Sequence, residues 1–322
     1  MKYVFIIGCP RSGSTWTSFL LAQHQKVATL QHLKLFDYLI RMDQWHERKA
    51  NYAFTIDPLS KEQTKDYNLR LSETMPLERF HGMLGDFAKS ILNFAGEIRP
   101  GVEMIVDKTP ENCHHADFIL DTIPDAYFLH IIRDPRSTFC SHRSAAETWA
   151  KWDFPSKSND GARYWKHDVE VSLDVKNKTE RYHEVRYEDL KDNGPTELAK
   201  ILSWLELDGD AEFIEKALAA SSKDKVRTTT ELPENFVRKV PKGGWRDELS
   251  KGDLGTIEYL AGDLMEKLGY ERALPKAKLK PLGLTLRDLP EPLLAFLKTR
   301  LGRATQLAHW AYVGRKTEWD NP

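Results

Sequence analysis

Residues 4–16, VFIIGCPRSGSTW, constrain the fold of this 322-residue chain more than any other stretch. The apolar run at 4–7 is typical of a buried strand. It leads through a turn with Gly8 and Gly13 into residues 16–21, whose apolar pattern predicts a helix. A strand, a glycine-bearing turn and a helix N-terminus direct backbone N–H groups and the helix dipole at one point. The sequence therefore predicts an anion site at the end of this strand.

The spacing of the two glycines nearly matches the phosphate-binding loop of ATPases, G-x-x-x-x-G-K-[ST]. Ser14 stands in the place of the lysine, and the basic residue is Arg11, inside the loop. We therefore expect the loop to hold a phosphate, but not a γ-phosphate with Mg²⁺.

Bulk properties set the class of protein. A hydrophobic content of 41% is enough for a large core, and a net charge of −1 gives no global reason to expect nucleic acid or an anionic membrane as a partner. Three cysteines, Cys9, Cys113 and Cys140, do not make a disulfide framework. No apolar run approaches the ~20 residues of a transmembrane helix. We expect a soluble, cytoplasmic protein.

Strands alternate with helices along the chain, which predicts an α/β fold with a parallel sheet wrapped on both faces and ligands at the carboxyl ends of the strands. The expected strands are residues 4–7, 27–30, 102–107, 126–132 and 181–187. Expected helices beyond the first include residues 160–176, 196–205 and 254–268, the last ending at Gly269, and 221–252 is expected to be a long polar loop.

Two segments stand apart from this alternation. Residues 41–100 are charged and aromatic and predict a helical insertion of two or three helices, on the acceptor side. Residues 273–322 predict a linker, to about 290, and an amphipathic helix over 290–313. We therefore expect one α/β domain over 1–272 and a C-terminal helical tail over 273–322.

A second anion site is predicted at the end of the strand 126–132. Arg133 follows this strand and Ser141 lies eight residues later, and a guanidinium fork with a hydroxyl suits a phosphate. The alternative is that Arg133 and Asp134 form an ordinary surface ion pair. Because parallel strands present their carboxyl ends at one edge, two anion sites there favour a nucleotide with two separated phosphate groups.

With these motifs the chain resembles the sulfotransferase family that uses 3′-phosphoadenosine-5′-phosphosulfate (PAPS). CPRSGSTW resembles the family's 5′-phosphosulfate loop, and Arg133 and Ser141 match the pair that holds the 3′-phosphate. RYEDL at 186–190 resembles the segment whose tyrosine lies near the adenine, and 238–246 resembles the late loop R-K-G-x-x-G-D-W-K, with Val240 and Gly244 departing from it. The implied cofactor-binding residues are Pro10, Arg11, Ser12, Gly13, Ser14, Thr15, Trp16, Arg133, Ser141, Tyr187, Arg238 and Lys239.

The resemblance implies a P-loop-type central parallel sheet flanked by helices, with PAPS as donor and in-line transfer of its sulfonate to a hydroxyl. Arg11 and Lys108 would contact the transferred group, and no metal is expected. DKTP at 107–110 resembles the bacterial and tyrosylprotein-type branches, and Pro110 stands where the cytosolic branch has its histidine base. The general base is then sought elsewhere: His32 is the first candidate, and Glu111, His114 and His115 are the others.

The acceptor is left open among small-molecule, lipid and carbohydrate hydroxyls, a phenol included. Aromatic residues of 36–100 and 149–165 are candidates for its pocket or, at helical spacing, for core. The tail would cover the core, close over the site or form a homodimer. A P-loop small-molecule kinase is disfavoured because the loop lacks its lysine and only Asp107 offers a magnesium-binding carboxylate after a strand. A non-catalytic nucleotide-binding protein on the same fold is the other alternative.

Overall fold

The computed structural model describes residues 1–47, 72, 75–97, 99–151, 153–222 and 243–275. By its internal contacts the chain divides into Met1–Leu274 and Pro275–Pro322. The predicted helix at 290–313, most of the predicted linker, and Arg238 and Lys239 lie outside the described residues.

Five parallel strands form the central sheet, in the order β2-β3-β1-β4-β5. They are β1 (Lys2–Ile7), β2 (Val27–Gln31), β3 (Met104–Lys108), β4 (Tyr127–Ile132) and β5 (Tyr182–Arg186). Each predicted strand is present, with ends within two residues of the expected ones. The parallel α/β class is therefore confirmed, because continuous β-branched and aromatic runs are what a sheet buried on both faces requires.

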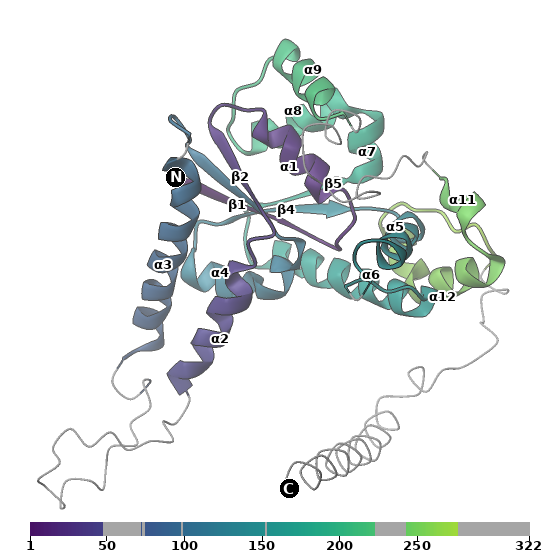
Figure 1. Cartoon of the computed structure of the whole chain (residues 1–322), viewed down its shortest axis with the longest axis horizontal. Helices are drawn as coiled ribbons and strands as arrows, with labels where there is room; N and C mark the ends of the chain where they lie inside the picture. Colours follow the sequence, from purple (N-terminus) through teal and green to yellow (C-terminus); the bar gives the residue numbers. More distant parts are fainter. Residues whose placement is uncertain (48–71, 73–74, 98, 152, 223–242, 276–322) are drawn as a thin grey trace, which may run out of the picture. The chain divides into compact units, whose positions relative to one another are not determined.

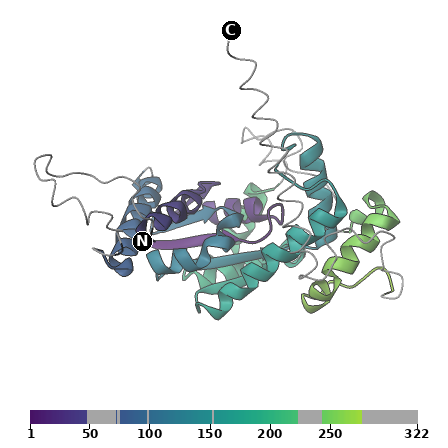
Figure 2. The ribbon, with the colours of Figure 1, turned by 90° about the horizontal axis from the view of Figure 1, so that it is seen from below.

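Helices cover both faces of the sheet, as Figures 1 and 2 show. On one face Tyr3, Phe5 and Ile7 of β1 pack with α2 (Leu35–Glu47), α3 (Leu77–Glu97) and α4 (Ala116–Thr122). On the other face Val4 and Ile6 pack with α1 (Ser14–Ala22), α7 (Tyr187–Asp192), α8 (Gly194–Trp204) and α9 (Ala211–Ala220). This division follows from the alternation of side chains along a strand.

The remaining described helices lie beyond the carboxyl ends of the strands or beside them. They are the 3₁₀ helices η3 (Pro110–His115) and η4 (Val175–Asn177), and α5 (Pro135–Glu147), α6 (Ser158–Asp174), α11 (Trp245–Glu248) and α12 (Lys251–Lys267). Gly269 has φ 80°, the left-handed conformation expected of the glycine that ends α12. None of the described helices combines the length and apolar character needed to cross a bilayer.

The structure differs from the predicted elements in three places. The insertion contributes α2 and α3, but α2 begins at Leu35, before the expected boundary. The predicted polar loop 221–252 contains α11 and the first two residues of α12. Helix α9 was not predicted, although Asp210 caps it by accepting a hydrogen bond from the Phe213 N–H at 2.8 Å. That cap, followed by the apolar pattern of 213–218, was the available signal.

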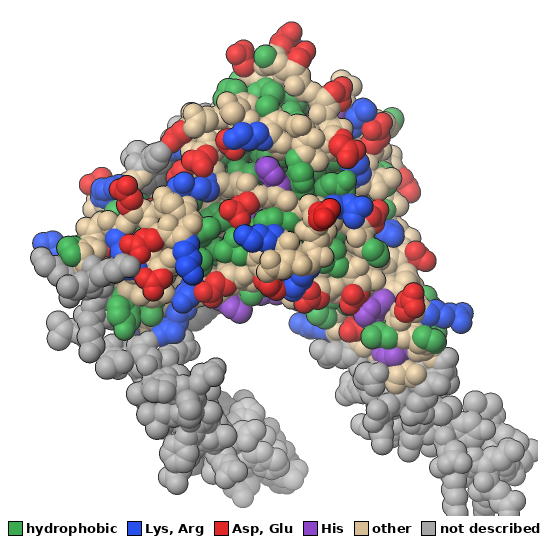
Figure 3. All heavy atoms as spheres, turned by 180° about the vertical axis from the view of Figure 1, so that it is seen from behind, with side chains coloured by type: hydrophobic (Ala, Val, Ile, Leu, Met, Phe, Trp, Pro, Cys, Tyr) green, Lys and Arg blue, Asp and Glu red, His purple; other side chains and the backbone are tan. Residues whose placement is uncertain are grey.

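The order of the strands explains where a ligand binds. β1 lies between β3 and β4, and the chain leaves β1 toward β2 on one side but leaves β4 toward β5 on the other. Such a switch point opens a crevice at the carboxyl ends of the two central strands. The two predicted anion sites follow β1 and β4, so the fold places them beside each other. The face in Figure 3 carries acidic and basic side chains interspersed, in keeping with the small net charge.

Candidate active site

A cavity of about 450 Å³ opens at the carboxyl end of the sheet, a volume typical of small-molecule sites. All five strands contribute to it through the residues that follow them. These are Pro10, Arg11, Gly13, Ser14, Thr15 and Trp16 after β1, His32 and Lys34 after β2, Pro110 and Glu111 after β3, Arg133 after β4, and Tyr187 after β5. Helix α5 adds Ser137, Cys140 and Ser141.

The loop after β1 leaves the N-terminus of α1 open to this cavity. Gly13 is the N-cap residue with φ 104°, and it has no side chain to occupy the first N–H groups of the helix. The first turn of α1 also holds no acidic residue. Ser12 is buried rather than at the cavity wall, and its Oγ has no hydrogen-bond partner among the described residues. Free N–H groups and an unsatisfied hydroxyl beside a helix N-terminus suit an anion such as phosphate.

Gly13 is required here for two reasons. Its positive φ disfavours any residue with a side chain, and a Cβ would lie 2.3 Å from the ring of Tyr187.

We expect Gly13→Ala to lower the free energy of unfolding by about 3 kcal/mol, from strain and overpacking together. Gly82→Ala is the matched control, because a Cβ there meets nothing within 4 Å inside helix α3; it should stabilise by about 0.5–1 kcal/mol. Chemical denaturation measures both, and equal effects would contradict this account of the loop.

The two predicted anion sites meet directly. The Arg133 guanidinium donates from Nη1 to the carbonyl oxygen of Arg11 at 3.0 Å, and Arg11 donates from Nε to Oγ of Ser141 at 3.2 Å. Arg133 also lies over the ring of Tyr187, 4.6 Å from its centroid. These four residues therefore form one basic cluster across the ends of β1, β4 and β5.

Arg133 is available to a ligand because Asp134 is committed elsewhere. The carboxylate of Asp134 binds Arg136 at 2.7 Å, and Arg136 also binds the buried carboxylate of Glu258 at 2.7 Å. Arg136 is buried, and its guanidinium lies 4.0 Å from the ring centroid of Trp245. The predicted alternative, a surface pair of Arg133 with Asp134, is thus replaced by a buried network of Asp134, Arg136 and Glu258.

His32 and Lys108 lie together at the opposite side of the cavity. The N–H of His32 donates to the carbonyl oxygen of Lys108 at 3.0 Å, which continues the pairing of β2 with β3. Burial lowers the pKa of His32 to about 4, and the charges of Lys108, Lys34 and Arg11 add to this effect. The imidazole is therefore neutral at pH 7, the form that accepts a proton.

Lys108 is a buried cation rather than part of the cavity wall. Its side chain is 1% exposed, and burial lowers its pKa to about 8 although Glu111 and Asp107 act in the opposite direction.

Asp107 accepts hydrogen bonds from Thr109 at 2.7 Å and Asn112 at 3.0 Å. Burial raises the pKa of Asp107 to about 6. Asp107 thus fixes the turn after β3, and it does not line the cavity as a magnesium-binding carboxylate would.

The structure separates the other three candidate bases. Glu111 lines the cavity, and its Oε2 is buried without a hydrogen-bond partner among the described residues. His114 instead pairs with Asp168 at 2.9 Å, and His115 pairs with Asp37 at 2.6 Å. Neither of these two histidines lines the cavity. Of the four candidates, His32 and Glu111 are the ones placed to reach a bound acceptor.

An aromatic wall completes the cavity, formed by Trp149, Phe154 and Tyr164. The guanidinium of Arg11 lies 5.3 Å from the ring centroid of Trp149. All three belong to the segment 149–165, whose aromatic residues were candidates for the pocket. Trp165 is fully buried and donates from Nε1 to the carbonyl oxygen of Arg133 at 2.8 Å, so it supports the site from behind.

The described part of the insertion does not reach this cavity. No described residue of 36–97 lines it, and Phe80 and Leu84 of α3 pack in the core beneath the sheet. The side chain of Trp45 and residue 152 lie outside what the structure describes. Of the aromatic residues of α3, Phe80 therefore belongs to the core, whereas Phe87 and Phe94 are exposed.

Beneath the loop, His142 supports the backbone of Pro10. Its Nε2 donates to the carbonyl oxygen of Pro10 at 2.9 Å, and its ring stacks on Phe154. Burial lowers the pKa of His142 to about 3, so the side chain stays neutral and adds no charge beneath the loop.

Comparison with known proteins identifies the family. A model described as "Sulfotransferase family" matches residues 4–211, which is more than half of the chain and contains all five strands except the first two residues of β1. The chain belongs to the sulfotransferase family. The resemblance drawn from the loop at 8–15, Arg133 and Ser141 is therefore confirmed at the level of family.

Two curated relatives of this sulfotransferase are protein-tyrosine sulfotransferases. The Drosophila melanogaster protein is 26% identical over 173 residues, 53% of this chain but 31% of that protein. Protein-tyrosine sulfotransferase A of Caenorhabditis elegans is 20% identical over 278 residues, 84% of this chain and 67% of that protein. The chain thus matches less than a third of the Drosophila relative's length.

Solved structures agree with the sulfotransferase fold. The sulfotransferase domain of the Synechococcus PCC 7002 olefin synthase superposes with a TM-score of 0.53 at 20% identity, over 85% of this chain and 96% of that domain. A mouse sulfotransferase in complex with PAP, which is adenosine 3′,5′-bisphosphate, has a TM-score of 0.51 at 13% identity. The match covers 82% of this chain and 84% of the mouse chain. At such identities the likeness concerns the fold.

Proposed function

We propose that this sulfotransferase transfers the sulfonate group of PAPS to a hydroxyl group of its acceptor by in-line displacement. The observation that carries the proposal is the meeting of the loop at Arg11 with Arg133 and Ser141 at one cavity. One nucleotide with phosphates at its 5′ and 3′ positions satisfies both groups. The mouse relative crystallised with PAP supports this choice of nucleotide.

The residues present fit such a donor. The uncapped N-terminus of α1 and the orphaned hydroxyl of Ser12 suit the 5′-phosphosulfate, and Arg133 and Ser141 suit the 3′-phosphate. PAPS supplies an activated sulfonate with a phosphate leaving group. Charge grows on the oxygen that bridges phosphorus and sulfur as such a group departs, and Arg11 and Lys108 are the cations proposed to stabilise it.

The acceptor hydroxyl must lose its proton during the transfer. The neutral imidazole of His32 lines the same cavity as the loop, so a ring nitrogen of His32 is the proposed proton acceptor. Because Lys108, Lys34 and Arg11 disfavour its protonated form before the donor binds, the anionic donor would relieve part of this effect and make the imidazole a stronger base.

We further propose a phenolic hydroxyl as the preferred acceptor. Trp149, Phe154 and Tyr164 offer an apolar aromatic surface beside Arg11, which suits a flat ring. The curated relatives that act on protein tyrosine add support for the same functional group. Aliphatic alcohols, carbohydrates and lipids are the alternatives that the following assay separates.

Transfer of radiolabelled sulfonate from PAPS tests the proposal, with tyrosine peptides, simple phenols, sugars and lipid alcohols as acceptors and EDTA present throughout. Labelled product is expected with phenolic acceptors. Transfer only to another class would overturn the acceptor assignment. Binding of PAP without transfer to any acceptor would favour a non-catalytic nucleotide-binding protein, and transfer of the γ-phosphate of ATP would favour a kinase.

Arg133→Ala should remove the preference for the 3′-phosphate. A guanidinium bound to phosphate contributes about 1.5–3 kcal/mol, so we expect the affinity for PAP to fall by about 10- to 100-fold. Affinity for 5′-AMP, which lacks that phosphate, should change little, and calorimetric titration of both nucleotides provides the internal control. Equal losses for the two would mean that Arg133 acts only by supporting the carbonyl of Arg11.

The low pKa of His32 predicts an unusual pH dependence. Because His32 accepts a proton only when neutral, and its pKa lies at about 4, kcat/KM should stay level from pH 7 to about 5 and fall below that. A histidine with an ordinary pKa near 6.5 would give a tenfold fall per unit below that value. Lys34→Gln removes one of the cations that lower the pKa and should move the acid limb upward. An acid limb at 6.5, unmoved in Lys34→Gln, would contradict this assignment.

A further inference from the structure

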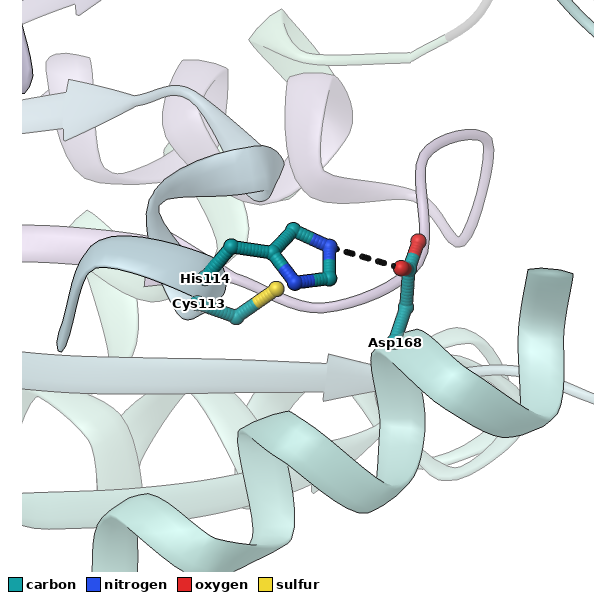
Figure 4. A group of neighbouring side chains, drawn as sticks. All are labelled: Cys113, His114 and Asp168. Carbon is teal, nitrogen blue, oxygen red and sulfur yellow. Dashed lines mark hydrogen bonds and ion pairs between the residues drawn. The ribbon is translucent and has the colours of Figure 1, made fainter. Parts of the chain in front are cut away.

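A cluster of metal-binding side chains lies outside the proposed reaction. Cys113 and His114 of η3 and Asp168 of α6 have ligand atoms that all lie within 4.8 Å of one another. In Figure 4 the imidazole of His114 sits between the sulfur of Cys113 and the carboxylate of Asp168. Its Nε2 lies 2.9 Å from Oδ1 of Asp168. None of these residues lines the cavity.

The fold brings a fourth such residue to the same place. Cys9 follows β1, Cys113 follows β3, and these two strands are neighbours in the sheet. The N–H of Gly8 donates to the carbonyl of Pro110 at 3.3 Å, which holds the two following loops together. The thiol of Cys9 thereby comes near Asp168 and Cys113. Its sulfur lies 4.0 Å from Nε2 of His142 and outside the group of three within 4.8 Å, so it would have to move toward a bound ion. Sequence spacing could not reveal this group, because its members come from three distant segments.

In the metal-free cluster His114 forms an ion pair with Asp168 at 2.9 Å, and a metal ion would take over the balance of that carboxylate's charge. Asp168 is 1% exposed, and a buried carboxylate ordinarily requires a cationic partner. No lysine or arginine of the described chain pairs with it; its neighbours are His114 of η3, His167 of α6 and Cys9 of the loop after β1. Every one of these partners is itself of a type that binds metals.

We propose that Cys113, His114 and Asp168 bind one Zn²⁺ ion, with Cys9 as the fourth ligand. Thiolate, imidazole and carboxylate are the ligands of tetrahedral zinc, whereas Mg²⁺ and Ca²⁺ select oxygen. Binding draws the ligand atoms inward to the ~2.0–2.3 Å bonds of such a site. The ion ties together the loop after β1, η3 and α6, which are three segments around the cavity. None of the four ligands lines the cavity, so the role of the ion is structural.

The test uses the full chain without an affinity tag, stripped of metal with a chelator. Titration with Co²⁺ should give a thiolate-to-cobalt charge-transfer band that saturates at one ion per chain and is abolished by added Zn²⁺. Cys113→Ser should weaken or abolish the band, and Asp168→Asn should reduce the affinity by about tenfold or more. Cys140→Ser, which removes the third buried cysteine, is the matched control and should leave the band unchanged.

A second measurement needs no variant. X-ray absorption of the zinc-loaded wild-type protein should show sulfur at about 2.3 Å and lighter atoms at about 2.0 Å from the metal. Zinc should also raise the melting temperature of the wild-type protein, because it binds the folded state. Absence of cobalt–thiolate absorption, a zinc shell of nitrogen and oxygen alone, or an unchanged band in Cys113→Ser would overturn the proposal.

Discussion

Replacing Arg11 by alanine is expected to lower kcat/KM for PAPS by about 10³-fold or more. Arg11 is the cation of the phosphate loop, and removing one charged donor from a group-transfer site typically costs 10²–10⁵-fold. The fold should survive, because Arg11 already has a positive φ of 70° and alanine introduces no new backbone strain. The lost contacts are those with Ser141 and Trp149 at the cavity wall.

Arg11→Lys is the matched control. It keeps the charge but loses the planar fork, so it should recover part of the activity while binding PAP more weakly than the wild type. Single-turnover rates at saturating PAPS separate the chemical step from binding. A rate for Arg11→Ala within tenfold of the wild type would mean that another cation, such as Lys108 or Arg133, stabilises the leaving group instead.

Replacing His32 by alanine should reduce kcat by about 10²–10⁴-fold, the usual contribution of a general base. The affinity for PAP should be nearly unchanged, because His32 lies after β2, on the opposite side of the cavity from Arg133. Added imidazole should restore part of the activity to His32→Ala. A merely structural role for His32 would not produce that rescue.

Glu111→Gln is the variant that decides between the two candidates at the cavity. It keeps the shape of the side chain and removes its ability to accept a proton. If His32 is the base, this variant should remain within about tenfold of the wild type. Unchanged turnover in His32→Ala together with a large loss in Glu111→Gln would assign the proton transfer to Glu111.

The sheet and the meeting of Arg11 with Arg133 and Ser141 could be predicted because each depends on local signals. Apolar β-branched runs marked the strands, and the glycines around Arg11 marked the loop. Because the carboxyl ends of parallel strands lie at the same edge of a sheet, Arg133 and Ser141 could be predicted to lie near that loop. Such inferences need no knowledge of which side chains meet.

The remaining features of the site depend on tertiary pairing. Nothing in the sequence indicates that His114 pairs with Asp168 and His115 with Asp37. Because these two histidines are paired elsewhere, His32 and Glu111 are the candidate bases that remain at the cavity. For the same reason the sequence could not divide its aromatic residues between cavity and core. Tyr164 and Trp165 are adjacent aromatic residues of α6, and only the packing shows that Tyr164 lines the cavity and Trp165 is buried behind it.

The central claim is that one bisphosphorylated adenosine spans the loop at Arg11 and the pair Arg133–Ser141. Calorimetric titration of PAP in EDTA, beside 5′-AMP in EDTA and ATP with Mg²⁺, tests it most directly. The account predicts that PAP binds without metal and more tightly than the other two. Tighter binding of ATP with Mg²⁺, or equal binding of PAP and 5′-AMP, would contradict it.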